Sequence, residues 1–65
     1  MKHIYIQPHT FIELKAKPGT SLATALIEAQ QFVDEHRIEL AELECDGLIY
    51  AVAKNKTLYY IKNKQ

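Results

Sequence analysis

A row of carboxylates occupies the middle of the chain. In residues 41–46, Glu42, Glu44 and Asp46 fall at every second position, and Glu39 lies just before them. Alternate residues of a β-strand point to one face, so these acids would form a row. Paired carboxylates serve acid–base catalysis, but no other residues complete a hydrolase. We therefore interpret the row as a binding surface, which could dock on a basic protein groove or imitate the spaced phosphates of a nucleic acid. The alternative is the solvated face of an amphipathic strand.

A second constellation mixes lysines with tyrosines near the C-terminus. Lys54, Lys56, Tyr59 and Lys62 lie within nine residues. Aromatic rings can stack on bases while lysines meet phosphates, which is typical of single-strand binders. A chain without net positive charge lacks the usual electrostatic footprint of such proteins, and lysines also protect exposed sheet edges. Nucleic-acid binding is therefore the alternative function.

The remaining reactive side chains are His3, His9, His36 and the single Cys45. No pair among them has the spacing of metal ligands, so we expect neither a metal nor a cofactor. Cys45 alternates with apolar residues, which predicts a small buried hydrophobe. The spacing supplies no general base that would make it a nucleophile.

Hydrophobic periodicity predicts the elements that position these residues. Alternation favours short strands at residues 3–7, 11–17, 41–46, 48–53 and 57–61. In the first strand, Ile4 and Ile6 would share the buried face. Asp46-Gly47 is typical of a type I′ hairpin turn, because both central positions need positive φ.

The period becomes helical over residues 21–37, directly after the Pro18-Gly19 turn. Thr20 or Ser21 can cap this helix, and residues 36–37 would suit its last turn. Its apolar stripe comprises Leu22, Ala25, Leu26, Ala29, Phe32 and Val33. Ile27 falls outside the stripe, so we expect it to be exposed and available for contact.

The resulting order is β-β-α-β-β-β. It predicts one two-layer α+β domain over residues 1–65, in which the helix packs on a small, mainly antiparallel sheet. The last three strands would form an antiparallel meander, because their connections are short.

Composition excludes several classes of protein. The 65 residues are 48% hydrophobic and carry no net charge, which argues against disorder. One cysteine cannot form a disulfide scaffold, and no apolar run is long enough to cross a membrane. With no secretory signal in view, we expect a cytoplasmic protein. So short a chain has little room for a substrate cavity, and dimerisation commonly stabilises chains of this size.

The neutral total hides a segregation of charge. Residues 21–46 carry a formal charge of −6, whereas residues 1–20 carry +2 and residues 47–65 carry +4. Such poles orient encounters with charged partners, including another copy of the chain. They are also common on surfaces whose only role is solubility.

Two stretches resemble known families. The strand, Lys17-Pro18-Gly19-Thr20-Ser21 turn and alanine-rich helix over residues 12–29 resemble the opening of β-grasp domains such as sulfur carriers. Those carriers end in Gly-Gly and this chain ends in Asn63-Lys64-Gln65, so the carrier function does not transfer.

The helix with Ala25 and Ala29, the acidic strand and residues 46–50 resemble short phage and mobile-element proteins, among them some anti-CRISPR inhibitors. That resemblance implies stoichiometric binding to a larger host protein or complex. No functional residue is carried over from it. We expect a non-enzymatic interaction module, and the acidic strand and the exposed side of the helix give its contact residues as Glu39, Glu42, Glu44, Asp46 and Ile27. Small size and charge segregation separately predict a homodimer.

Overall fold

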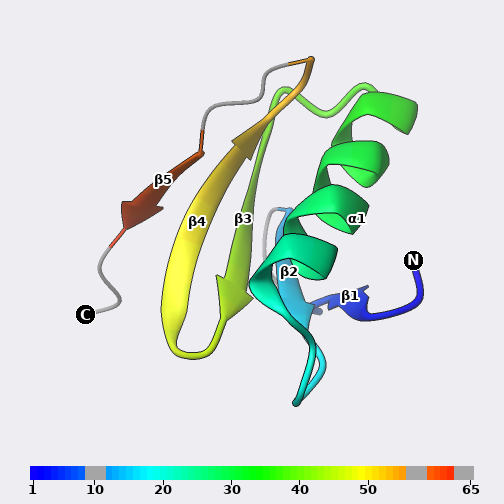
Figure 1. Ribbon diagram of the computed structural model, residues 1–65. Helices are drawn as coiled ribbons and strands as arrows, with labels where there is room; N and C mark the ends of the chain where they lie inside the picture. The colour runs from blue at the N-terminus through cyan, green and yellow to red at the C-terminus, as the bar shows by residue number, and fades with distance from the viewer. Residues whose placement is uncertain (9–11, 56–58, 63–65) are drawn as a thin grey trace.

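The computed structural model describes residues 1–8 and 12–55 in full and residues 59–62 as backbone. The elements are β1 (Ile4–Ile6), β2 (Glu13–Ala16), α1 (Leu22–Glu35), β3 (Leu40–Cys45), β4 (Leu48–Ala53) and β5 (Tyr59–Lys62). Their order confirms the predicted β-β-α-β-β-β arrangement, and each strand lies within about two residues of its expected position (Figure 1).

The strands form one sheet in the order β1-β2-β3-β4-β5, with α1 on one of its faces (Figure 1). β1 pairs with β2, and β3, β4 and β5 pair in turn, all antiparallel. β2 and β3 are parallel, because the chain between them crosses the sheet as α1. The fold is therefore the expected α+β type, mainly antiparallel, including the meander of the last three strands.

The helix begins as predicted. Ser21 has extended backbone angles, and its Oγ accepts a hydrogen bond from the Thr24 amide at 3.2 Å. This bond satisfies one of the backbone donors that the first turn leaves unpaired, so Ser21 is the N-cap. With 14 residues, α1 falls short of the length and apolarity that crossing a membrane demands, and the described residues contain no longer helix.

The end of the helix corrects the prediction. Residues 36–37 lie beyond the last helical turn, because Arg37 adopts a left-handed φ of 56°. The Arg37 amide then donates to the Asp34 carbonyl, and the Ile38 amide donates to the Val33 carbonyl at 2.9 Å. This pair of bonds is a Schellman motif, with arginine where glycine is usual. Because glycine is absent from this position, the residue pattern contains no signal for the end of the helix.

The turn between β3 and β4 confirms its sequence signal. Asp46 and Gly47 have φ angles of 54° and 82°, as a type I′ turn requires. The turn places Cys45 opposite Leu48 and fixes the register of the whole β3–β4 pair. Every side chain of β3 is thereby assigned to a face.

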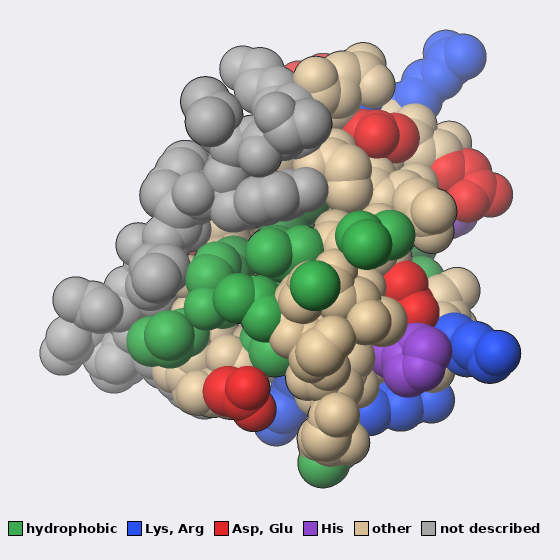
Figure 2. Space-filling view, viewed as in Figure 1, with side chains coloured by type: hydrophobic (Ala, Val, Ile, Leu, Met, Phe, Trp, Pro, Cys, Tyr) green, Lys and Arg blue, Asp and Glu red, His purple; other side chains and the backbone are tan. Residues whose placement is uncertain are grey.

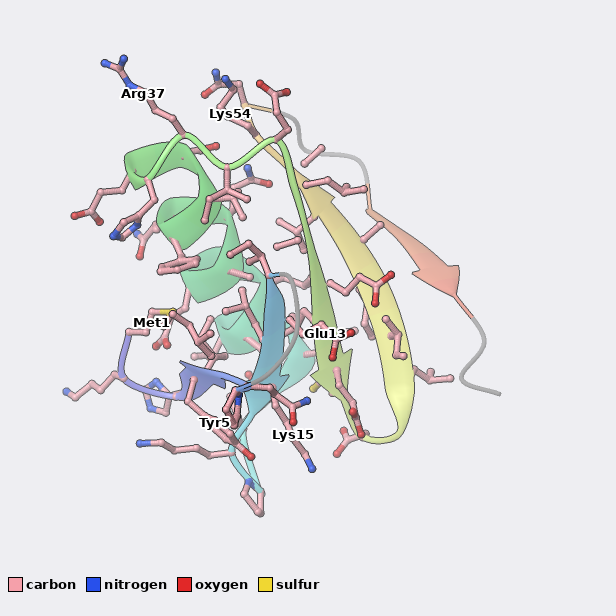
Figure 3. The ribbon with its side chains drawn as sticks, turned by 180° about the vertical axis from the view of Figure 1, so that it is seen from behind. Met1, Tyr5, Glu13, Lys15, Arg37 and Lys54 are labelled. Atoms are coloured by element: carbon pink, nitrogen blue, oxygen red, sulfur yellow. The ribbon has the colours of Figure 1, made fainter. Side chains whose placement is uncertain are left out.

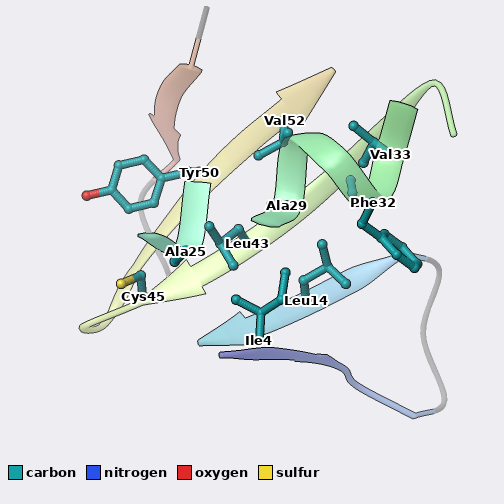
Figure 4. Packing of buried hydrophobic residues seen from close by; sticks show 11 residues of the cluster. Ile4, Leu14, Ala25, Ala29, Phe32, Val33, Leu43, Cys45, Tyr50 and Val52 are labelled. Atoms are coloured by element: carbon teal, nitrogen blue, oxygen red, sulfur yellow. The ribbon is translucent and has the colours of Figure 1, made fainter. Parts of the chain in front are cut away.

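The core lies between α1 and the sheet (Figure 4). Val33 from the helix and Leu43 from the central strand have no exposed surface. Cys45 is buried as expected, and burial followed by the nearby Asp46 carboxylate raises the pKa of its thiol. The buried cluster comprises Ile4, Leu14, Ala25, Ala29, Phe32, Val33, Ala41, Leu43, Cys45, Tyr50 and Val52.

Two expected core residues are exposed. Ile6 is 47% exposed, because β1 is an outermost strand and has a neighbour on one side only. Leu22 is 36% exposed, because it is the first residue of α1 and its side chain points back beyond the helix end. Ile27, expected outside the apolar stripe, is 59% exposed.

Candidate protein-interaction surface

The face of the sheet opposite α1 carries a mixed polar and apolar surface, which we call the open face. Its described side chains alternate along β2, β3 and β4 with Leu14, Leu43 and Tyr50, which pack into the core beneath α1. Figure 3 views this side of the molecule. The open face comprises Tyr5, Glu13, Lys15, Leu40, Glu42, Glu44, Ile49, Ala51 and Ala53.

Three carboxylates of the open face come from two neighbouring strands. Glu13 of β2 is the register partner of Glu42 of β3, and Glu44 follows two residues later. All three line a hollow of about 20 Å³, together with Gln7, Leu14 and Ile49. Such a volume holds about one water molecule, so the hollow is a surface feature and not a substrate pocket.

Apolar and basic groups border these acids. Lys15 is the register partner of Glu44 on one side, and Ile49 is its partner on the other. Tyr5, 40% exposed, is in turn the register partner of Lys15. One row across the sheet therefore presents an aromatic ring, a cation, a carboxylate and a branched aliphatic group.

The five residues predicted to bind a partner do not form one surface. Glu42 and Glu44 lie side by side on the open face and are partly buried. Asp46 is exposed in the turn after β3, while Glu39 precedes the other end of that strand, about 20 Å away at 3.3 Å per residue. Ile27 lies on the helix layer. The structure thus keeps the pair in β3 and separates the other three.

Glu39 takes part in an ion pair with a residue of the alternative, nucleic-acid set. Lys54 Nζ lies 3.0 Å from Glu39 Oε2, and the Lys54 amide donates to the Glu39 carbonyl at 3.2 Å. The Glu39 side chain is 85% exposed, so the pair contributes less than about 1 kcal/mol to stability. The acidic and basic segments therefore meet at this end of the sheet.

The rest of the basic constellation lies outside the described side chains. Lys56 falls in an undescribed segment, and Tyr59 and Lys62 are described as backbone only. The Cα of Lys62 is the register partner of Ile49. The nucleic-acid set therefore stays a prediction.

Sequence reasoning missed Glu13 as a member of the acidic group. Its alternation with Leu14 predicted an outward position, but its neighbour in space depends on how β2 pairs with β3. These strands are separated by the whole helix, and the register of a parallel pair has no local turn to fix it. No signal in one sequence gives that pairing.

Glu28 has a structural role that sequence reasoning also missed. Its Oε1 accepts hydrogen bonds from the Lys2 and His3 amides at 3.0 and 2.7 Å, and its Oε2 lies 2.6 Å from His3 Nδ1. The His3 side chain and then the backbone amides lower the pKa of Glu28 from 4.5 to about 2. Glu28 therefore holds the start of the chain against α1.

A broader hollow lies beside this contact on the helix layer. Its volume is about 240 Å³, below the 300–1,000 Å³ usual for small-molecule sites. It is lined by Met1, Glu28, Gln31, Phe32, Glu35 and His36. The His36 ring lies 4.5 Å from the Phe32 ring, and its Nδ1 is 3.0 Å from the Phe32 carbonyl oxygen.

Hydrophobic side chains also gather on the helix layer, between α1 and β4 (Figure 2). Leu48 is 39% exposed there, at the start of β4. Within residues 1–8 and 12–55, no three His, Cys, Asp or Glu side chains group as metal ligands would. No protein family, curated protein or solved structure matches the chain.

Proposed function

We propose that this chain is a non-enzymatic protein-interaction module whose open face binds a basic surface on a larger protein. One observation carries the proposal: α1 covers one face of the sheet, and the other face groups Glu13, Glu42 and Glu44 around the partly buried Ile49. A rigid sheet presents these groups without further ordering, which lowers the entropy cost of binding.

The chemistry of the open face suits a partner that supplies lysines or arginines. Opposite charges across an interface steer encounter and select the partner, while apolar contacts at the centre supply much of the affinity. Ile49 and Tyr5 supply that apolar area, and the three acids supply the charge. Lys15 beside Glu44 would discriminate against uniformly basic surfaces such as polylysine.

The size of the hollows favours binding over catalysis. The acidic hollow holds about one water molecule, so it cannot exclude solvent around a substrate. The larger hollow lies on the other layer, away from the three grouped acids. The larger hollow has two carboxylates in its lining, but Glu28 is engaged by the Lys2 and His3 amides, so the two do not form the available pair that acid–base catalysis would require.

The finer proposal is a stoichiometric inhibitor from a phage or other mobile element, acting in the cytoplasm. Its support is the resemblance of the helix and acidic strand to such proteins, together with the small size of the chain. The unpaired Cys45 is compatible with a reducing compartment. Nucleic-acid binding through Lys54, Lys56, Tyr59 and Lys62 remains the alternative, although Lys54 is engaged by Glu39.

Three immobilised proteins test the proposal: the wild-type chain, Glu42→Lys and Glu35→Lys. Both variants change the net charge equally, but Glu35 is exposed on the helix layer. Extract of the host cell is passed over each, and retained proteins are quantified by mass spectrometry. We expect one protein or complex to be retained by wild type and Glu35→Lys, and reduced at least tenfold on Glu42→Lys.

Circular dichroism establishes that both variants are folded before they are used. Equal retention by all three proteins, or loss on Glu35→Lys alone, would overturn the proposal. A parallel titration with a labelled single-stranded oligonucleotide examines the alternative. Binding that falls steeply with salt would favour nucleic acid, because released counterions make such affinity salt-dependent.

A further inference from the structure

The outer edge of β1 has backbone groups that are not used within the described sheet. The Gln7 amide donates to the Glu13 carbonyl, and the Lys17 amide donates to the His3 carbonyl, both at 2.8 Å. In an antiparallel pair, hydrogen-bonded positions alternate. Residues 3, 5 and 7 therefore face β2, and the amide and carbonyl groups of Ile4 and Ile6 face away from it.

The side chains along this edge are apolar. Ile4-Tyr5-Ile6 contains no charged residue, and Tyr5 and Ile6 are 40% and 47% exposed. Natural edge strands are usually protected by lysine, proline or a bulge, because bare edges pair with other strands. Pro8 follows the strand but leaves its three residues unprotected. The edge therefore has the features of a pairing surface.

We propose that β1 pairs with β1 of a second copy of this chain, antiparallel about a two-fold axis at Tyr5. In this register Ile4 lies opposite Ile6 of the second copy, and each copy offers two amides and two carbonyls. All four outward amides then find acceptors. The two five-stranded sheets become one continuous sheet with both helices on the same side.

The placement of side chains suits this register. Residues directly opposite in an antiparallel pair point to the same face, so the exposed Ile6 would lie beside Ile4 of the second copy, at the border of its core. The two Tyr5 rings would meet on the open face. This contact accounts for an isoleucine that lies on the core side of β1 and is nevertheless half-exposed.

Charge does not oppose the pairing. Lys2 would lie opposite Pro8, so no like charges face each other across the axis. Lys15 is one strand inside Tyr5, which places the two Lys15 side chains three strand spacings, about 14 Å, apart. That separation exceeds the screening length of about 8 Å at physiological salt.

The interface is small, so we expect a weak dimer. Three paired residues on each side bury less area than the roughly 1,200–2,000 Å² of stable complexes. Sedimentation velocity from about 5 μM to about 1 mM covers dissociation constants of this class. We expect the weight-average mass to rise from monomer toward dimer across that range.

Variants at Ile6 test the register. Ile6→Pro removes an outward amide and leaves the β1–β2 bonds intact. Because symmetry removes two hydrogen bonds from the dimer, its dissociation constant should rise about 30-fold. Ile6→Lys should weaken the dimer by a similar factor, by placing a charge at the edge. Ile27→Lys is the control, because Ile27 is exposed on the helix layer, and its dimer should match wild type within about twofold.

Amide hydrogen exchange supplies a readout that does not depend on a variant. The Ile4 and Ile6 amides should be protected at high concentration and exchange rapidly on dilution, whereas the Tyr5 amide, which faces β2, should be protected throughout. A monomer at every concentration would overturn the proposal. So would a dimer that survives both Ile6 variants, is lost in Ile27→Lys, or leaves the Ile4 and Ile6 amides unprotected.

Discussion

His3 Nδ1 lies 2.6 Å from Oε2 of Glu28, and this contact joins the residue before β1 to the middle of α1. The other carboxylate oxygen, Oε1, accepts hydrogen bonds from the Lys2 and His3 amides. Glu28 therefore satisfies two backbone donors and one ring nitrogen at once. It fixes the start of the chain against the helix layer.

The first prediction concerns the pH dependence of this contact. Hydrogen bonds from His3 and Lys2 lower the pKa of Glu28 from 4.5 to about 2 in the folded state. A depressed carboxyl pKa contributes stability that is fully present above 4.5 and is lost as the pH falls toward 2. Glu28→Gln should thus melt below wild type at pH 7, and the two melting temperatures should converge between pH 4.5 and 2.

Thermal melts by circular dichroism at intervals across that range measure the difference. Glu35→Gln is the matched control, because Glu35 is an exposed acid in the same helix. If the melting temperature of Glu28→Gln lies below that of wild type by the same amount at every pH, the assigned role of the carboxylate is contradicted.

The second prediction compares two leucines of β3. Leu43 has no exposed surface, whereas Leu40 is 51% exposed. Leu43→Ala should lower the free energy of unfolding by about 2–5 kcal/mol, because it removes buried methyl groups and leaves a cavity. Leu40→Ala should cost well under that, about 0.5 kcal/mol. Urea unfolding of both variants measures the contrast, and equal losses would contradict the assignment of faces.

The third prediction concerns the end of the helix. Arg37 holds a left-handed φ of 56° at the position where a Schellman motif normally has glycine. Arg37→Gly should raise the free energy of unfolding by about 0.5–1 kcal/mol by relieving this strain. Arg37→Ala removes the same charge without relieving the strain. Stabilisation by alanine as well as glycine would point to charge as the cause.

Local patterns were sufficient for most of the fold. The β3–β4 hairpin could be predicted because Asp46-Gly47 fixes its turn and alternation fixes its faces. The start of the helix could be predicted from Ser21, because its Oγ accepts a hydrogen bond from the amide of Thr24, only three residues later. These features depend on neighbours in the sequence, so a single sequence contains them.

The parts that could not be predicted depend on contacts between distant segments. Glu13 joins Glu42 only through the parallel β2–β3 register, and Glu28 meets His3 across 25 residues. The exposure of Ile6 follows from the place of β1 at the sheet edge, which the alternating pattern does not encode. The candidate surface was therefore predicted in part: its two central acids were identified, and its third acid was not.

The fourth prediction follows from the mixed composition of the open face. Binding that combines carboxylates with Ile49 should weaken with salt but persist, because apolar contact is not screened. We expect the affinity for the retained protein to fall about three- to tenfold between 50 and 500 mM salt. Complete release in that range would indicate a purely electrostatic, non-specific attachment.

The most direct test uses nuclear magnetic resonance of the isotopically labelled chain to map the surface on which the retained protein binds. If the open face is the binding surface, amide signals of Glu13, Glu42 and Ile49 should shift or broaden with saturation near one equivalent, while Glu35 and Ile27 on the helix layer stay unchanged. Perturbation confined to α1, with the strand signals unaffected, would contradict the central claim.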